Sequence, residues 1–104
     1  MIYNKLVRDK IPEIMEESGK NATFRQLSQE EYFPYLETQL DEEVGEYHAD
    51  HTLEELADIL EVVYALAAAQ GSTKEELLAV YDRKHAQRGG FEKRLLLMEA
   101  ERRE

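Results

Sequence analysis

A chain of 104 residues with 13 basic and 23 acidic side chains has a formal net charge of -10 and contains no cysteine. That length suits one domain whose modest core a partner subunit would enlarge, so we predict a single domain over residues 1–104. The acidic balance is the wrong sign for a protein that grips nucleic-acid phosphates, and the lack of cysteine excludes a disulfide framework and a thiolate zinc site.

A membrane partner is not expected either. The longest uninterrupted apolar run, residues 62–69, is far shorter than the roughly 20 residues that a membrane-spanning helix needs. The opening sequence MIYNKLVRDK has no apolar segment of the kind that a signal peptide carries. The sequence therefore predicts a cytoplasmic protein that binds neither nucleic acid nor membrane.

The first third of the chain predicts a short helix, an extended stretch and the start of a long helix. Residues 10–17 form the short helix, with Pro12 in its first turn, where proline is tolerated. Residues 22–27, ATFRQL, have the composition of an extended segment. Residues 28–31, SQEE, fit a capping box, but Pro34 lacks a backbone donor, so we expect the regular part of the long helix to begin near Pro34.

Apolar side chains then recur every three or four residues to about position 48, which predicts a helix with one face on the core. The stripe consists of Phe33, Leu36, Leu40, Val44 and Tyr47. Gly45 lies inside this helix, where glycine costs about 1 kcal/mol relative to alanine. That cost is easier to understand if another backbone or a ligand approaches closely there.

Two more helices are predicted in the second half of the chain. Residues 53–70 are apolar on nearly every side, and Gly71 is placed to end this helix in a left-handed cap. Residues 72–87 predict a third substantial helix, which Arg-Gly-Gly at 88–90 would stop, and residues 91–96 fit either a short strand or a frayed helix. We predict an all-α fold, an antiparallel helical bundle whose central helix hairpin carries carboxylates and is completed by a second subunit.

Two pairs of carboxylates lie on the two helices that flank the short central turn. Glu43 and Glu46 are three residues apart, as are Glu55 and Asp58, and this spacing places each pair on one face of a helix. Thr52 begins the sequence Thr-Leu-Glu-Glu, a predicted capping box with Glu55 at its third helical position. Because the second helix runs back along the first, Glu46 should face Glu55, and Glu43 should face Asp58.

Most glutamates in so acidic a chain are simply solvated, but the positions of these favour a metal site. Glu55 shares its stripe with the apolar side chains of Ile59, Val62 and Leu66, and Glu43 lies at the margin of the apolar stripe on its own helix. Carboxylates that share a buried pocket repel each other, so protons or a cation must compensate. Oxygen ligands without histidine or cysteine favour Mg²⁺, with Mn²⁺ as the alternative.

A magnesium site built from carboxylates usually leaves room for a phosphate ligand. Lys84 and Arg88 are four residues apart and continue the face of an apolar stripe, so their charged groups could project towards the metal. The alternative is a solvated basic helix end, which also suits the helix dipole. Lys5 and Arg8 form a second basic group, for which surface decoration is the alternative.

The acidic motifs resemble those of a known superfamily. EEVGE at 42–46 followed by ELAD at 55–58 resembles the ExxE and ExxD signature of the MazG-like all-α nucleoside triphosphate pyrophosphohydrolases. YNKLVRDKIPEI near the N-terminus and RGGFEKR at 88–94 resemble one compact branch of that superfamily, often labelled phosphoribosyl-ATP pyrophosphohydrolase-like. Gln39 stands where this branch often has a lysine, and the link between the two motifs is short.

The resemblance implies a helical fold whose subunits pair and a Mg²⁺-dependent enzyme that cleaves the α–β phosphate bond of a nucleotide, giving a monophosphate and pyrophosphate. It also implies the metal ligands, which are Glu43, Glu46, Glu55 and Asp58. We expect Glu43 or Glu46 to accept a proton from the attacking water, and a homodimer or higher homo-oligomer to form.

Two other functions remain open at this point. One is hydrolysis of phosphoribosyl-ATP in histidine synthesis, which is the same chemistry on a larger substrate. The other is a non-catalytic helical interaction protein whose acidic face binds a partner or only confers solubility. The resemblance does not settle the base or the sugar of the nucleotide.

Overall fold

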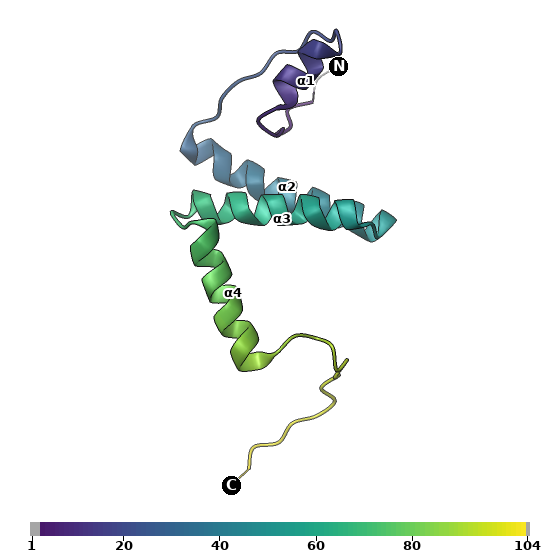
Figure 1. Ribbon diagram of the computed structural model, residues 1–104, viewed down its shortest axis with the longest axis vertical. Helices are drawn as coiled ribbons and strands as arrows, with labels where there is room; N and C mark the ends of the chain where they lie inside the picture. The colour runs from purple at the N-terminus through teal and green to yellow at the C-terminus, as the bar shows by residue number, and fades with distance from the viewer. Residues whose placement is uncertain (1–2, 104) are drawn as a thin grey trace.

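The computed structural model describes residues 3–103 and is helical throughout its regular parts (Figure 1). The helices in this range are α1 (Ile11–Glu17), α2 (Gln29–Asp50), α3 (Leu53–Ala69) and α4 (Lys74–Arg88). Residues 3–103 contain no strand, so the prediction of an all-α chain is confirmed for them. None of the helices there is long and apolar enough to cross a membrane.

The arrangement of the helices is open. Helices α2 and α3 lie side by side, joined only by His51 and Thr52, while α4 contacts the end of α3 and then leads away (Figure 1). Helix α1 packs against none of the other helices described. The radius of gyration is 18.8 Å, whereas a compact chain of this length has about 13 Å. The α2–α3 pair is therefore the structural centre of an extended molecule.

A complete capping box starts α2. The Glu31 backbone N–H donates to the Ser28 hydroxyl at 3.2 Å, and the Ser28 backbone N–H donates to the Glu31 carboxylate at 3.1 Å. Arg25 donates two further hydrogen bonds to that carboxylate, which with the Ser28 bond lower the pKa of Glu31 to about 2. The helix thus begins at Gln29, and the prediction that it begins near Pro34 is wrong. Because the cap fixes the first turn, Pro34 forfeits only its own backbone hydrogen bond.

The ends of α3 and α4 follow the local signals, and one prediction for an irregular segment is wrong. Gly71 adopts φ 87° just after α3, and Gly89 adopts φ 77° just after α4, as expected for residues that end helices. Residues 22–27, predicted as an extended segment, belong to neither a helix nor a strand. Residues 91–103 are neither strand nor helix, so both alternatives for residues 91–96 are wrong.

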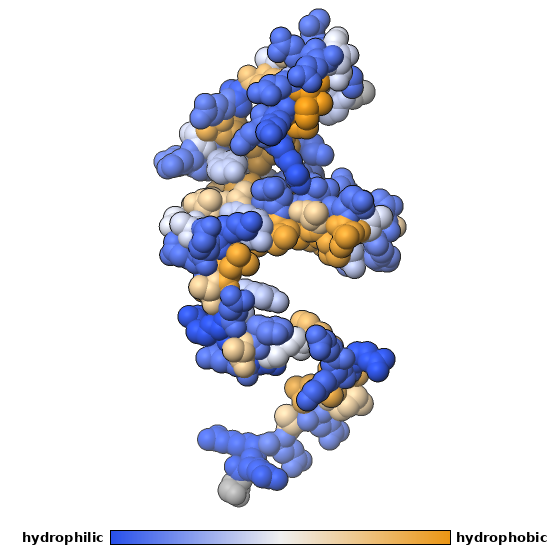
Figure 2. All heavy atoms as spheres, in the orientation of Figure 1, coloured by the Kyte–Doolittle hydropathy of each residue, from blue (hydrophilic) through white to orange (hydrophobic). Residues whose placement is uncertain are grey.

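The described chain has almost no closed apolar core. Only Leu36 on α2 and Val62 on α3 are buried hydrophobic side chains there. Apolar side chains reach the surface along the α2–α3 pair (Figure 2), and Leu53, Leu56 and Leu60 of α3 are 78%, 45% and 48% exposed. The packing that holds α2 against α3 is therefore narrow, and one side of α3 is left uncovered.

The caps give a prediction about stability. We expect Ser28→Ala to lower the free energy of unfolding by about 1 kcal/mol, because one backbone N–H at the start of α2 loses its acceptor. Chemical denaturation followed by circular dichroism at fixed protein concentration measures this. Ser72→Ala, beside the cap residue of α4, is the matched control and should have a smaller effect. Equal effects of the two substitutions would contradict the role of Ser28.

Candidate metal centre

Three of the four predicted metal ligands meet where α2 packs on α3. Glu43 comes from α2, and Glu55 and Asp58 come from α3; each offers a carboxylate oxygen, and the three oxygens lie within 4.8 Å of one another. Glu43 is only 9% exposed, and the other two are half-buried. Ligand oxygens on opposite sides of an octahedral Mg²⁺ are about 4.2 Å apart. The three carboxylates, which we call the acidic cluster, therefore have nearly the spacing that this ion needs.

Glu46, the fourth predicted ligand, lies at the edge of the acidic cluster. It is one helical turn beyond Glu43 on α2 and is exposed. It does not belong to the group within 4.8 Å, yet its charge helps to raise the pKa of both Glu43 and Glu55. Glu46 is thus close enough to act electrostatically on the cluster and remains accessible to solvent.

The environment of the acidic cluster resists negative charge. Burial raises the pKa of Glu43 above its ordinary value, and the charges of Glu46 and Asp58 add to this rise against the opposing hydrogen bond from Gln39. Loss of hydration also raises the pKa of Glu55, and the neighbouring Asp50 adds to it. Carboxylates that crowd together favour a bound proton or a bound cation.

Glu43 carries an unsatisfied acceptor. The Gln39 side-chain amide donates to Oε1 of Glu43 at 2.7 Å. The other oxygen, Oε2, is buried and accepts no hydrogen bond from the described residues. A buried acceptor without a partner costs about 1–3 kcal/mol, and native proteins rarely leave one. Together with the two neighbouring carboxylates, this oxygen fits a hard divalent cation as its missing partner.

The start of α3 explains why the Glu55 carboxylate is available. Thr52 accepts a hydrogen bond from the Glu55 backbone N–H at 3.2 Å, but the structure shows no return bond from the Thr52 backbone to the Glu55 carboxylate, in contrast to Glu31 and Glu76. The predicted capping box at Thr52 is therefore only half formed. The Glu55 side chain lies with Asp58 in the acidic cluster instead of closing its own cap.

One predicted basic residue reaches the acidic cluster. Arg8 donates from Nη2 to Oδ1 of Asp58 at 2.6 Å, which ties the N-terminal segment to α3 across 50 positions of sequence. Both side chains are partly exposed, so the pair contributes little stability by itself. The pair matters because it places a guanidinium group beside a candidate metal ligand.

The other basic candidates are not brought to the acidic cluster in this chain. Lys84 and Arg88 are exposed on α4, which leaves α3 at the end opposite to the cluster (Figure 1). Asp58 is eleven residues from the end of α3 at Ala69, which is about 16 Å along the helix axis. Lys5 lines a small pocket against α2 that adjoins the cluster.

A groove gives access to the acidic cluster. It has a volume of about 1240 Å³ and runs between the N-terminal segment and the α2–α3 pair. Glu43, Asp58 and Arg8 line it together with the apolar side chains of Leu36 and Val62. Small-molecule sites usually have about 300–1,000 Å³, so the groove is large enough for a ligand that reaches the carboxylates.

Two site residues were missed from the sequence. Gln39 was interpreted only as a departure from the branch pattern, although its spacing of four residues from Glu43 on a helix could have indicated contact. The predicted helix ends at about position 48, but α2 continues through Asp50, whose carboxyl lies close enough to Glu55 to raise the pKa of that group.

Comparison with known proteins gives no activity. No family model matches the chain, and no solved structure matches it. An uncharacterized protein of Mycolicibacterium smegmatis is 48% identical over 48 residues, which are 46% of this chain and 49% of that protein. The matched stretch thus spans about half the length of the relative.

The raised pKa values predict how stability depends on pH. Because the native state holds protons on Glu43 and Glu55 more tightly than the unfolded chain does, the free energy of unfolding should fall as pH rises above 4.5 through their native pKa values. Glu31, whose native pKa is about 2, contributes stability that is lost only as pH falls from 4.5 towards 2. Denaturation at a series of pH values without divalent metal tests this.

Glu43→Gln and Mg²⁺ should both change that pH dependence. The substitution removes the buried charge, so it should raise stability without metal by about 1 kcal/mol and flatten the fall above pH 4.5. Added Mg²⁺ should stabilise the unsubstituted protein more at higher pH, since binding displaces protons, and should not stabilise Glu43→Gln. Glu37→Gln, at an exposed position on the same helix, should behave like the unsubstituted protein. Stability that is independent of Mg²⁺ would refute the metal centre.

Proposed function

We propose that the protein is a Mg²⁺-dependent nucleotide pyrophosphohydrolase of the MazG-like superfamily, which hydrolyses the α–β phosphate bond of a nucleoside triphosphate or a related nucleotide. The observation that carries the proposal is the acidic cluster, in which carboxylates from the ExxE and ExxD motifs lie within 4.8 Å. Within it, one oxygen of Glu43 is buried without a hydrogen-bond partner. A solvated acidic face would not need to bury such a group.

The metal would be held by Glu43, Glu55 and Asp58, with Glu46 completing the set. When bound, Mg²⁺ neutralises phosphate charge and lowers the pKa of a coordinated water. Glu46 is exposed at the edge of the cluster, which suits it to accept a proton from the attacking water. Glu43 suits this role less, because it is buried and engaged by Gln39.

Arg8 and Lys5 are the basic side chains best placed for phosphate. Arg8 lies in the groove beside Asp58, and a guanidinium group can donate two parallel hydrogen bonds to one phosphate. Lys5 lies three residues earlier in the same segment and could contact a neighbouring phosphate of the same nucleotide. Lys84 and Arg88, on the outlying α4, would take part only if they reached the site of a second copy.

We also propose that the protein is a homodimer or a higher homo-oligomer. Its accessible surface is 9968 Å² for 12.1 kDa, whereas a folded monomer of that mass exposes about 6000 Å². The surplus, roughly 4000 Å² per chain, exceeds the roughly 1000–2500 Å² that each partner covers in an obligate homodimer, so it leaves room for such an interface. The uncovered side of α3, with Leu53, Leu56 and Leu60, is the surface on which a second copy would pack.

Hydrolysis of phosphoribosyl-ATP is the alternative substrate assignment. It is favoured by one observation, the groove volume of about 1240 Å³, which exceeds the roughly 300–1,000 Å³ of most small-molecule sites. A substrate with a second ribose phosphate would use more of that space. The carboxylates and Arg8 would have the same roles in either reaction.

The hydrolase proposal predicts pyrophosphate release. Purified protein with Mg²⁺ should release pyrophosphate from at least one member of a panel of ordinary and modified nucleoside triphosphates and phosphoribosyl-ATP. Glu55→Gln should reduce turnover by at least about 100-fold, because it removes a charged metal ligand, while the circular dichroism of the helices is unchanged. Glu54→Gln, the neighbouring exposed residue, is the control and should retain activity.

Different outcomes separate the rival functions. Product from phosphoribosyl-ATP alone would favour the histidine-synthesis substrate. Full activity of Glu55→Gln would remove this residue from the site. Saturable Mg²⁺ binding without turnover of any nucleotide would contradict the hydrolase, and weak, nonsaturating binding would favour the non-catalytic interaction protein.

The proposed oligomer gives a separate prediction. The unsubstituted protein should sediment as a dimer or larger, whereas Leu56→Glu combined with Leu60→Glu should shift it towards monomer, because two charges would be placed on the uncovered side of α3. Glu54→Gln again serves as control. A stable monomer for the unsubstituted protein in sedimentation analysis would rule out the proposed assembly.

A further inference from the structure

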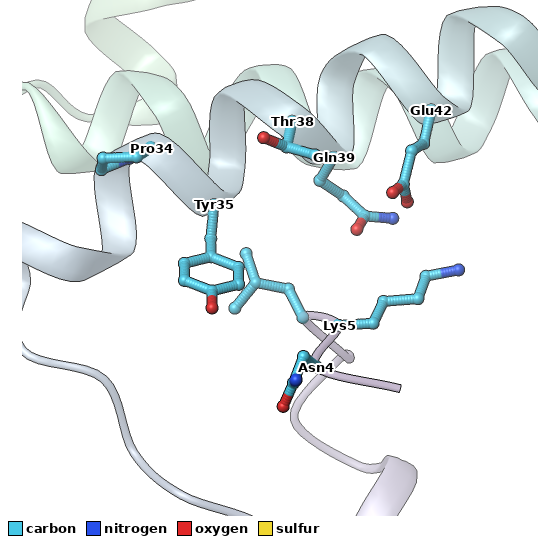
Figure 3. Close-up of a pocket in the computed structure, with 8 residues that line it drawn as sticks. Asn4, Lys5, Pro34, Tyr35, Thr38, Gln39 and Glu42 are labelled. Atoms are coloured by element: carbon cyan, nitrogen blue, oxygen red, sulfur yellow. The ribbon is translucent and has the colours of Figure 1, made fainter. Parts of the chain in front are cut away.

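A second, smaller pocket lies beside the acidic cluster. It has a volume of about 170 Å³ and is bounded by residues 4–6 on one side and by α2 on the other. Figure 3 shows Tyr35, Gln39 and Glu42 of α2 extending towards the segment that carries Lys5, with Thr38 at the helix surface between them. The pocket is smaller than the roughly 300–1,000 Å³ that whole ligands occupy, so it suits one part of a ligand.

The pocket side of α2 is separate from the side that packs on the core. Tyr35, Thr38, Gln39 and Glu42 are spaced by three, one and three residues, so they share one helix face. Leu36, by contrast, is buried and lies about 100° around the helix from Tyr35. Tyr35, Thr38 and Glu42 are therefore exposed and free to contact a ligand, while Gln39 also contacts Glu43.

The pocket is continuous with the acidic cluster. Leu6 and Gln39 line both the pocket and the groove that contains Glu43. The Gln39 amide also donates to Glu43 at 2.7 Å, so one side chain belongs to both places. Tyr35 and Glu43 are eight residues apart on α2, about 12 Å along the axis. A nucleotide with phosphates at the cluster could place its base beside Tyr35.

The α2 wall of the pocket matches a flat ring that donates hydrogen bonds, whereas Lys5 on the opposite wall can only donate. The aromatic ring of Tyr35, which is 37% exposed, can stack on a base. Gln39 gives one of its two amide N–H donors to Glu43 and keeps its oxygen as an acceptor, while the Glu42 carboxylate accepts only. An acceptor-only carboxylate in the pocket wall favours a base that carries an exocyclic amino group over one that presents a carbonyl there.

We propose that this pocket is the base-binding subsite and that Glu42 with Gln39 selects nucleotides whose base has an exocyclic amino group. Cytosine, adenine and guanine satisfy this condition, and uracil and thymine do not. The inference rests on the proposed function for the identity of the ligand as a nucleotide. It goes further in naming the class of base and the residues that select it.

The test measures binding of product-like nucleotides without metal, so that it does not depend on hydrolysis. Calorimetric titration of the full chain with cytidine and uridine monophosphate should show the cytidine compound binding at least about tenfold more tightly, as expected for one hydrogen bond to a charged acceptor. Glu42→Ala should remove most of that preference. Tyr35→Ala should weaken both nucleotides by about tenfold, and Tyr35→Phe should retain affinity because the ring remains.

Glu37→Ala, at an exposed position on α2 outside the pocket, is the control and should not change the affinity for either nucleotide. Circular dichroism verifies the fold of every variant. Equal binding of the two nucleotides, or a preference that survives Glu42→Ala, would overturn the subsite. Hydrolysis of cytidine and uridine triphosphates is measured in parallel. Turnover without base preference would overturn the subsite alone, whereas absence of both binding and turnover for every nucleotide would also remove the proposed function.

Discussion

The burial of one carboxylate between two helices constrains this molecule most. Glu43 is 9% exposed in the interface that also contains Leu36 and Val62, and only one of its oxygens has a hydrogen-bond donor. With so few apolar side chains to hold α2 on α3, an acidic group among them opposes the packing. Groups that weaken a fold in this way are typical of functional sites, where stability is sacrificed for chemistry.

The same conflict appears at the starts of the helices. Three helices begin with a hydroxyl residue followed three positions later by glutamate, and at α2 and α4 this glutamate completes the cap. At α3 the Thr52 hydroxyl still accepts its hydrogen bond, but Glu55 lies with the acidic cluster. The capping box is complete at α2 and α4, where the glutamate has no acidic cluster beside it. It is broken at α3, where the Glu55 carboxylate lies beside those of Glu43 and Asp58 instead of closing the cap.

Helical periodicity was sufficient to predict most of the fold and the centre of the site. The spacings of three and four residues predict the helices, and Thr52 with Gly71 bounds α3 correctly. Same-face spacing on two helices joined by two residues is enough to predict that Glu43 approaches Asp58. The predicted start of α2 near Pro34 is wrong because proline removes only one backbone hydrogen bond, whereas the first turn is stabilised by the capping box and by Arg25 outside the helix.

Contacts between segments far apart in sequence could not be predicted in that way. Arg8 lies in an irregular segment, and no period relates it to Asp58, 50 positions later. The position of α4 depends on the turn after α3 and on any second copy, so the spacing of Lys84 and Arg88 could not indicate where their charges lie. The contact between Gln39 and Glu43, by contrast, follows from their spacing of four residues on one helix and could have been predicted.

The two features that the single chain leaves unsatisfied lie on the same helix. The first turns of α3 carry Glu55 and Asp58 towards α2 and expose Leu53 and Leu56 on another side. A cation at the acidic cluster would hold α3 against α2, and a second copy on the exposed side would hold α3 from the other direction. Because each would favour the same ordered position of α3, the proposed metal binding and the proposed association would strengthen each other, and such coupling is reciprocal by thermodynamic linkage.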